Sequence, residues 1–129
     1  MKIIVKSKIL IVENQIETLL SLILLLERAG FCVYGTQSGA DGIRLAQKEE
    51  FDLVILDVNL PDKDGFAVCD WLRQDFRFSR TPVFFISGLW NDENRRRAID
   101  LGVVECIERP IDAAAFAKRI SGYVKAPRK

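Results

Sequence analysis

Short apolar runs recur along the chain and alternate with longer segments of helical periodicity. The runs cover residues 9–12, 31–36, 53–56, 83–86 and 103–107. The run at 53–56 is an unbroken series of Leu, Val and Ile, which is typical of a strand buried on both faces. The alternation predicts five βα units and a parallel sheet. No linker interrupts it, so one domain is expected over residues 1–129, with a core at about 8–124 and a tail or linker start at 125–129.

The helices are placed by their caps and their apolar faces. The first helix is expected from about Gln15 to Ala29, with Asn14 as its N-cap. Its core face on a 3.6-residue period is expected to hold Ile16, Leu19, Leu20 and Ile23. Later helices are expected to begin near Ser38, Asp64, Asn91 and Asp112.

Composition excludes several classes of function. The chain has 129 residues, a net charge of +1, three cysteines and no histidine. The missing histidine excludes Ser-His-Asp and Cys-His catalysis and histidine metal sites. Near-neutral charge gives no reason to expect direct contact with nucleic acid or a membrane. Lysines interrupt the apolar N-terminus, which therefore lacks a signal-peptide pattern, and the odd cysteine count favours a reduced, cytoplasmic protein.

Polar residues stand at the ends of four of the five strands. They are Glu13-Asn14, Asp57, Ser87-Gly88 and Arg109-Pro110. The carboxyl ends of parallel strands meet at one edge of the sheet, where open α/β folds bind ligands. We therefore expect two carboxylates, a carboxamide, a hydroxyl and a fixed cation to gather there.

This set of groups suits phosphoryl transfer to an aspartate. A carboxylate such as Asp57 can act as the nucleophile and carry an acyl phosphate. Asp57 and Asn14 could bind Mg²⁺ directly and Glu13 through water, because Mg²⁺ prefers oxygen ligands and keeps several waters. Ser87 and Arg109 would then bind the phosphoryl oxygens.

Four motifs together resemble the receiver domain of response regulators, the CheY-like family of two-component signalling. They are ILIVEN, VILDVNLPDKDGF, PVFFISG and IERPID, in family order and spacing. The resemblance extends from about Lys8 to Val124. It implies a doubly wound, flavodoxin-like (βα)5 fold with strand order 2-1-3-4-5 and helices on both faces.

The resemblance also implies roles for individual residues. Asp57 would accept phosphate from a sensor histidine kinase or a phosphotransfer protein, and the chain would be a switch and not an enzyme. The backbone carbonyl of Asn59 would bind the metal, Gly88 would follow Ser87 in the phosphate-binding turn, and the peptide bond before Pro110 would be cis. An output face, for a homodimer or an effector, would comprise Arg95, Arg96, Arg97, Asp100, Glu105, Cys106 and Arg119.

Three positions depart from the family pattern. Asn14 replaces the second acidic residue after the first strand, which should weaken or abolish Mg²⁺ binding because ligand charge governs affinity for hard cations. Arg109 replaces a lysine, an exchange that is not conservative at a tight phosphate site. Cys106 replaces the aromatic that commonly reports activation.

Three functional hypotheses remain open at this stage. In the first, Asp57 is phosphorylated. In the second, the chain is a pseudo-receiver that binds partners unphosphorylated, with Arg109 holding Asp57 in a bidentate pair. In the third, it is a phosphohydrolase of the haloacid-dehalogenase type, although Asn59 stands where that family has a second acid.

Overall fold

The computed structural model describes residues 5–125, so residues 1–4 and most of the expected tail lie outside the described part. The strands are β1 (Lys8–Val12), β2 (Cys32–Thr36), β3 (Leu53–Asp57), β4 (Val83–Ser87) and β5 (Glu105–Glu108). The helices are α1 (Ile16–Arg28), α2 (Gly39–Lys48), α3 (Gly65–Gln74), α4 (Asp92–Asp100) and α5 (Ala113–Ser121), with a short 3-10 helix, η1 (Phe76–Phe78). The predicted alternation of strands and helices is confirmed.

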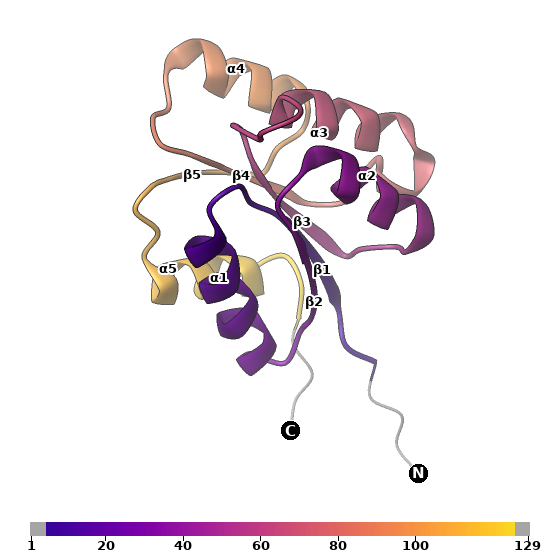
Figure 1. The fold of residues 1–129 in the computed structure, drawn as a ribbon, viewed down its shortest axis with the longest axis vertical. Helices are drawn as coiled ribbons and strands as arrows, with labels where there is room; N and C mark the ends of the chain where they lie inside the picture. Colours follow the sequence, from indigo (N-terminus) through magenta and orange to yellow (C-terminus); the bar gives the residue numbers. More distant parts are fainter. Residues whose placement is uncertain (1–4, 126–129) are drawn as a thin grey trace.

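The five strands form one parallel sheet in the order β2-β1-β3-β4-β5. Figure 1 shows α1 and α5 on one face of this sheet and α2, α3 and α4 on the other. The predicted doubly wound topology is therefore confirmed, and the reversal of strand order falls between β1 and β3. The carboxyl ends of β1 and β3 lie side by side at this switch point.

Two apolar cores pack against the two faces of the sheet. In β3, Leu53 and Ile55 belong to the core under α1 and α5, whereas Val54 and Leu56 belong to the core under α2, α3 and α4. Successive side chains of a strand point to opposite faces. Because both faces are covered, the strand is apolar throughout, which is why its sequence shows no alternation.

The start and the core face of α1 differ from the prediction. The N-cap is Gln15, and Asn14 belongs to the preceding turn. Ile16 and Leu20 are 42% and 57% exposed, while the buried residues of the helix are Leu19, Leu22 and Leu26. Leu and Ile occupy so many positions of this helix that a helical wheel gives more than one apolar stripe. Packing against β2 and α5 decides which stripe is buried.

The strand limits shift slightly from the apolar runs. Phe31 is a buried core residue just before β2, and β5 begins at Glu105 and not at residue 103. Within residues 5–125, no helix is both long enough and apolar enough to span a bilayer.

Candidate functional site

Asp57 is the last residue of β3 and is 4% exposed. Its Oδ1 accepts a hydrogen bond from the backbone N–H of Asn59 at 3.0 Å, and its Oδ2 accepts one from the backbone N–H of Asn14 at 3.4 Å. The loops that follow β3 and β1 thus both direct an N–H at this carboxylate. Such donors stabilise negative charge at the end of the strand.

Glu13 follows β1 directly and is fully buried beside Asp57. The Nη2 atom of Arg109 lies 2.7 Å from Oε2 of Glu13 and 3.0 Å from Oδ2 of Asp57, and it also contacts Oε1 of Glu13. One nitrogen is therefore shared by two carboxylates. The prediction of a bidentate pair between Arg109 and Asp57 is wrong. Arg109 contacts Asp57 through Nη2 alone, and Glu13 shares that nitrogen.

Two buried carboxylates with one shared cation perturb proton binding. Burial and the neighbouring Asp57 raise the pKa of Glu13 from 4.5 to about 7, against the opposing effect of Arg109. Burial disfavours the charged form of a carboxyl group, and a second carboxylate nearby acts in the same direction. Glu13 therefore keeps its proton to a higher pH than an ordinary glutamate does.

Arg109 is positioned by β4 and by the loop after β5. Its backbone N–H donates to the carbonyl of Ser87 at 2.9 Å, and the Arg109–Pro110 peptide bond is cis, as the resemblance implies. Nη1 of Arg109 donates to Oε1 of Gln15 at 3.4 Å. The guanidinium is thereby held across the ends of three strands.

The Ser87 side chain is bonded within its own turn. Its hydroxyl donates to the carbonyl of Leu89 at 3.1 Å and lies 3.4 Å from the Leu89 N–H, while Ser87 itself is 4% exposed. Gly88, which follows, is exposed, and no atom lies within 4 Å of the position of an added Cβ. The strand ends thus bring Glu13, Asp57 and Arg109 together, with Ser87 in the adjacent turn.

The loop after β3 is packed tightly against Asp57. A Cβ on Gly65 would lie 2.3 Å from the Asp57 carbonyl oxygen and 2.8 Å from Cα of Val58. Only glycine fits there, so α3 begins in direct contact with the phosphoacceptor candidate.

Asp62 and Asp64, in the loop after β3, cap two helices. Asp64 accepts from the Phe66 N–H at the start of α3. Asp62 accepts from the N–H groups of Gly39 and Ala40 at 2.8 and 2.9 Å, at the start of α2. These two bonds lower the pKa of Asp62.

Three residues near the site escaped prediction from the sequence. Gln15 binds Arg109, Gln37 donates from Nε2 to the Asn14 carbonyl at 3.0 Å, and Trp90 is buried in the loop after β4. Gln15 directly follows a polar strand end, which is a signal that could have been used. The contact of Gln37 depends on the pairing of β1 with β2 and had no local signal.

The residues do not fit a divalent cation in this arrangement. The backbone N–H of Asn14 points toward Asp57. Nη2 of Arg109 lies between the only two carboxylates that meet at the site among the described residues. No group of three or more His, Cys, Asp or Glu side chains suited to a metal occurs within residues 5–125. Mg²⁺ requires oxygen ligands. The carboxylate oxygens of Glu13 and Asp57 could serve only if Arg109 broke its ion pairs with them.

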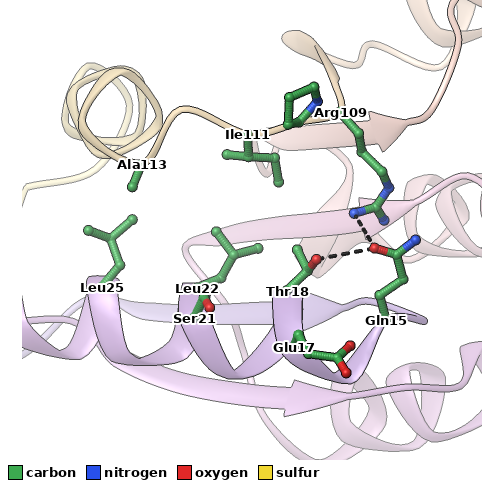
Figure 2. A pocket seen from close by; sticks show the side chains of 10 residues that line it. Gln15, Glu17, Thr18, Ser21, Leu22, Leu25, Arg109, Ile111 and Ala113 are labelled. Carbon is green, nitrogen blue, oxygen red and sulfur yellow. Dashed lines mark hydrogen bonds between the residues drawn. The ribbon is translucent and has the colours of Figure 1, made fainter.

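A groove runs beside the site between α1 and the segment from Arg109 to Ala113. Its volume is about 520 Å³. In Figure 2, Leu22 and Leu25 of α1 face Ile111 and Ala113, and the polar end of the groove is closed by the bond between Arg109 and Gln15. The groove is thus lined by apolar side chains along its length and ends at the charged cluster.

Several residues of the expected output face are engaged within the chain. The guanidinium of Arg95 lies over the Trp90 ring and that of Arg97 over Phe66, at 5.7 and 4.0 Å from the ring centroids. Nη1 of Arg119 lies 2.6 Å from Oε1 of Glu105 on β5. Arg96 and Asp100 are exposed on α4. Cys106 is half-buried, and burial raises the pKa of its thiol, which does not favour a reactive thiolate.

The family model of the response regulator receiver domain matches residues 9–121. The chain belongs to this family. Strand order and the strand-end cluster agree with that membership, and both favour a receiver over a haloacid-dehalogenase type of phosphohydrolase.

Two of the curated relatives are about twice as long as this chain. The Transcriptional activator protein IrlR of Burkholderia pseudomallei is 34% identical over 118 residues, which cover 92% of this chain and 50% of that protein. The Cell cycle response regulator CtrA of Brucella ovis is 30% identical over 118 residues, with the same coverage. The chain therefore spans about half the length of these relatives.

Solved receiver structures share the fold. The chemotaxis response regulator CheY4 of Vibrio cholerae superimposes with a TM-score of 0.87 at 23% identity and covers 93% of this chain and all of that one. The non-phosphorylated HemR receiver domain of Leptospira biflexa gives 0.86 at 27% identity and covers 96% of this chain and 98% of that one.

Proposed function

We propose that this receiver domain accepts a phosphoryl group on Asp57 from a histidine kinase or phosphotransfer protein of the cytoplasm. The observation that carries the proposal is the environment of the Asp57 carboxylate. It ends a central strand at the switch point of the sheet and meets two backbone N–H groups and the Arg109 guanidinium. These donors are suited to the negative oxygens of a transferred phosphoryl group.

In the proposed reaction, an oxygen of Asp57 attacks the phosphorus of a phosphohistidine. The new O–P bond forms as the P–N bond breaks, and the electron pair of that bond stays with the imidazole nitrogen. Arg109 is the cation closest to the incoming charge, and it can transfer its hydrogen bond from the carboxylate to a phosphoryl oxygen. The Ser87 hydroxyl can donate to another oxygen after leaving Leu89. The chain thus acts as a switch and catalyses at most its own modification.

The groove in Figure 2 is the proposed binding site of the phosphodonor protein. Its apolar sides, which include Leu22, Leu25 and Ile111, suit the apolar side of a partner helix, and its polar end lies at Arg109. A helix seated there would bring a phosphohistidine to the rim of the site. Output to a homodimer or an effector is assigned to the face of α4, β5 and α5.

The decisive experiment is incubation with a small phosphodonor, followed by intact-mass measurement. We expect one phosphate increment that is absent in Asp57→Ala. The reaction is run with Mg²⁺ and with a chelator, which tests the magnesium dependence implied by the resemblance. Recovery of weak labelling by Asn14→Asp would assign the weakness to metal binding, and recovery by Arg109→Lys would assign it to the phosphate cation. No increment under any condition would overturn the proposal.

A second candidate is a pseudo-receiver that binds partners without phosphorylation. Two observations favour it: Arg109 is already paired with both carboxylates, and the Ser87 hydroxyl is already bonded to Leu89. In this case the mass increment is absent, and Asp57→Ala binds an isolated partner as well as the unmodified chain does.

A further inference from the structure

The loop between β4 and α4 is anchored by a buried tryptophan. Trp90 is 8% exposed, and its indole Nε1–H donates to the carbonyl of Ile107 on β5 at 2.9 Å. Its ring stacks on Phe85 of β4 with an interplanar angle of 17°, and Arg95 of α4 lies over it. One side chain therefore ties this loop to β4, β5 and α4. A buried indole N–H requires such a partner.

The residue directly before this loop carries the hydroxyl that the proposed function gives to a phosphoryl oxygen. Ser87 ends β4, and its hydroxyl is bonded to both backbone groups of Leu89, the residue directly before Trp90. Leu89 is 73% exposed, and the space around Gly88 is open. Gly88 and Leu89, which lie between Ser87 and Trp90, are therefore loosely packed.

We propose that Trp90 is the positioning residue for Ser87, and that it transmits the state of the phosphoryl site to β5 and α4. The proposal rests on the proposed function. A serine hydroxyl has one proton to donate. When Ser87 donates it to a phosphoryl oxygen on Asp57, the bond to the Leu89 carbonyl is lost, and the change reaches Trp90 through a single residue.

The side chain at position 106 is consistent with this assignment. Cys106 of β5 packs against the apolar cluster that contains Trp90 and Phe85. A small residue on β5 leaves room for the indole of the loop. The aromatic group at this surface is thus supplied by the loop that carries Ser87, and not by β5.

The first test needs no phosphorylation. The chain has two tryptophans, so Trp71→Phe leaves Trp90 as the only indole emitter. In this background we expect Ser87→Ala to raise acrylamide quenching of Trp90 by about twofold, because the loop loses its bonds to Leu89 and opens more often. Ser79→Ala, which removes an exposed hydroxyl bonded to Phe76, is the matched control. Unchanged quenching in Ser87→Ala would overturn the coupling.

A second measurement does not need the Trp71→Phe substitution, and therefore still applies if that variant fails to fold. Fluorine NMR of the unsubstituted chain, labelled with fluorotryptophan, follows both indoles, and Trp90→Phe assigns its resonance. The Trp90 resonance should shift when the phosphate increment is present on Asp57 and should not shift in Ser87→Ala that carries the same increment. An equal shift in both proteins would contradict the proposal.

The second test separates positioning from simple support of the fold. Trp90→Phe keeps an aromatic ring but removes the indole N–H. We expect it to slow phosphoryl uptake several-fold, and to add no further loss in the Ser87→Ala background, because both changes act through one group. Fully additive effects would overturn the positioning role. If the unsubstituted chain takes up no phosphate at all, the proposed function fails, whereas the quenching test still decides the coupling between Ser87 and Trp90.

Discussion

At the scale of single residues, the site is an unbalanced charge cluster. Glu13 and Asp57 bring two carboxylates into a buried space where Arg109 supplies one cation. Desolvation of two like charges is costly, and one shared guanidinium nitrogen offsets only part of it. The cluster is therefore sensitive to pH and to the removal of any one member.

Glu13→Gln should change how stability depends on pH. Because the folded-state pKa of Glu13 is about 7 against an ordinary 4.5, the native state binds a proton in this interval that the unfolded state releases. The free energy of unfolding of the unsubstituted chain should therefore fall as pH rises from 4.5 to 7. Glu13→Gln should remove this decline and be more stable at pH 8, by no more than about 3 kcal/mol.

The measurement is urea unfolding at pH 5 and pH 8 with a chelator present. Glu17→Gln, at an exposed position of α1, is the control and should keep the slope of the unsubstituted chain. The same pH slope in Glu13→Gln would show that Glu13 does not hold the proton.

Gly65→Ala tests the contact between α3 and Asp57. The added Cβ would meet the Asp57 carbonyl oxygen at 2.3 Å, so the backbone must move. We expect a loss of about 2–3 kcal/mol in the free energy of unfolding, as for other overpacked positions. Gly88→Ala is the matched control, since an added Cβ there meets no atom within 4 Å. Equal stability of the two variants in urea unfolding would refute the steric argument.

At the scale of elements, helix ends are fixed by residues distant in sequence. The cap of α2 combines its local N-cap Ser38 with Asp62 from the loop after β3. The β3 loop that follows Asp57 is thereby tied to the first turn of α2. A carboxylate at a helix N-terminus satisfies free N–H groups and complements the helix dipole.

Asp62→Ala should loosen the first turn of α2. We expect faster amide exchange at Gly39 and Ala40 and a melting temperature lower by a few degrees. The bonds from Ala40 and Gly39 lower the pKa of Asp62 below the ordinary 3.8. The stability that Asp62 contributes is therefore present above pH 3.8 and is lost as the pH falls through the folded-state pKa. The difference between the two proteins should therefore disappear in stronger acid. Lys63→Ala is the control, and unchanged exchange at both amides in Asp62→Ala would refute the cap.

At the scale of the whole molecule, one arginine connects the segments on the α3 side of the sheet. Arg73 of α3 donates to the carbonyls of Phe78 and Thr81 at 2.8 and 2.7 Å, and to those of Leu101 and Gly102 at 2.7 and 3.1 Å. These carbonyls belong to the segment before β4 and to the turn after α4. Arg73 thus links two connections that the sheet itself does not join.

Arg73→Met should destabilise the whole domain. It keeps much of the apolar stem but leaves four carbonyls without their charged donor, and we expect a loss on the order of 2–3 kcal/mol in urea unfolding. Arg96→Met, on the exposed side of α4, is the matched control and should change stability by less than about 0.5 kcal/mol. A similar small effect in both variants would show that Arg73 is only a surface residue.

Much of the site could be predicted from residue types at strand ends. Asp57 and Arg109 each follow an apolar run, and parallel strands place such ends at one edge. The sharing of one Arg109 nitrogen by Glu13 and Asp57 could not be predicted, because it depends on side-chain distances across three strands. The same holds for Trp90, whose partner carbonyl lies on β5.

The sequence by itself determined the strands, the βα alternation and the chemical types at the sheet edge, because these follow from local periodicity and turn residues. Only the tertiary structure decided which stripe of α1 is buried, which loop caps α2 and which carboxylates share Arg109. Each of these depends on contacts between segments far apart in the chain. Sequence periodicity shows which faces of a helix are apolar, whereas tertiary packing decides which apolar face is buried and which residues it contacts.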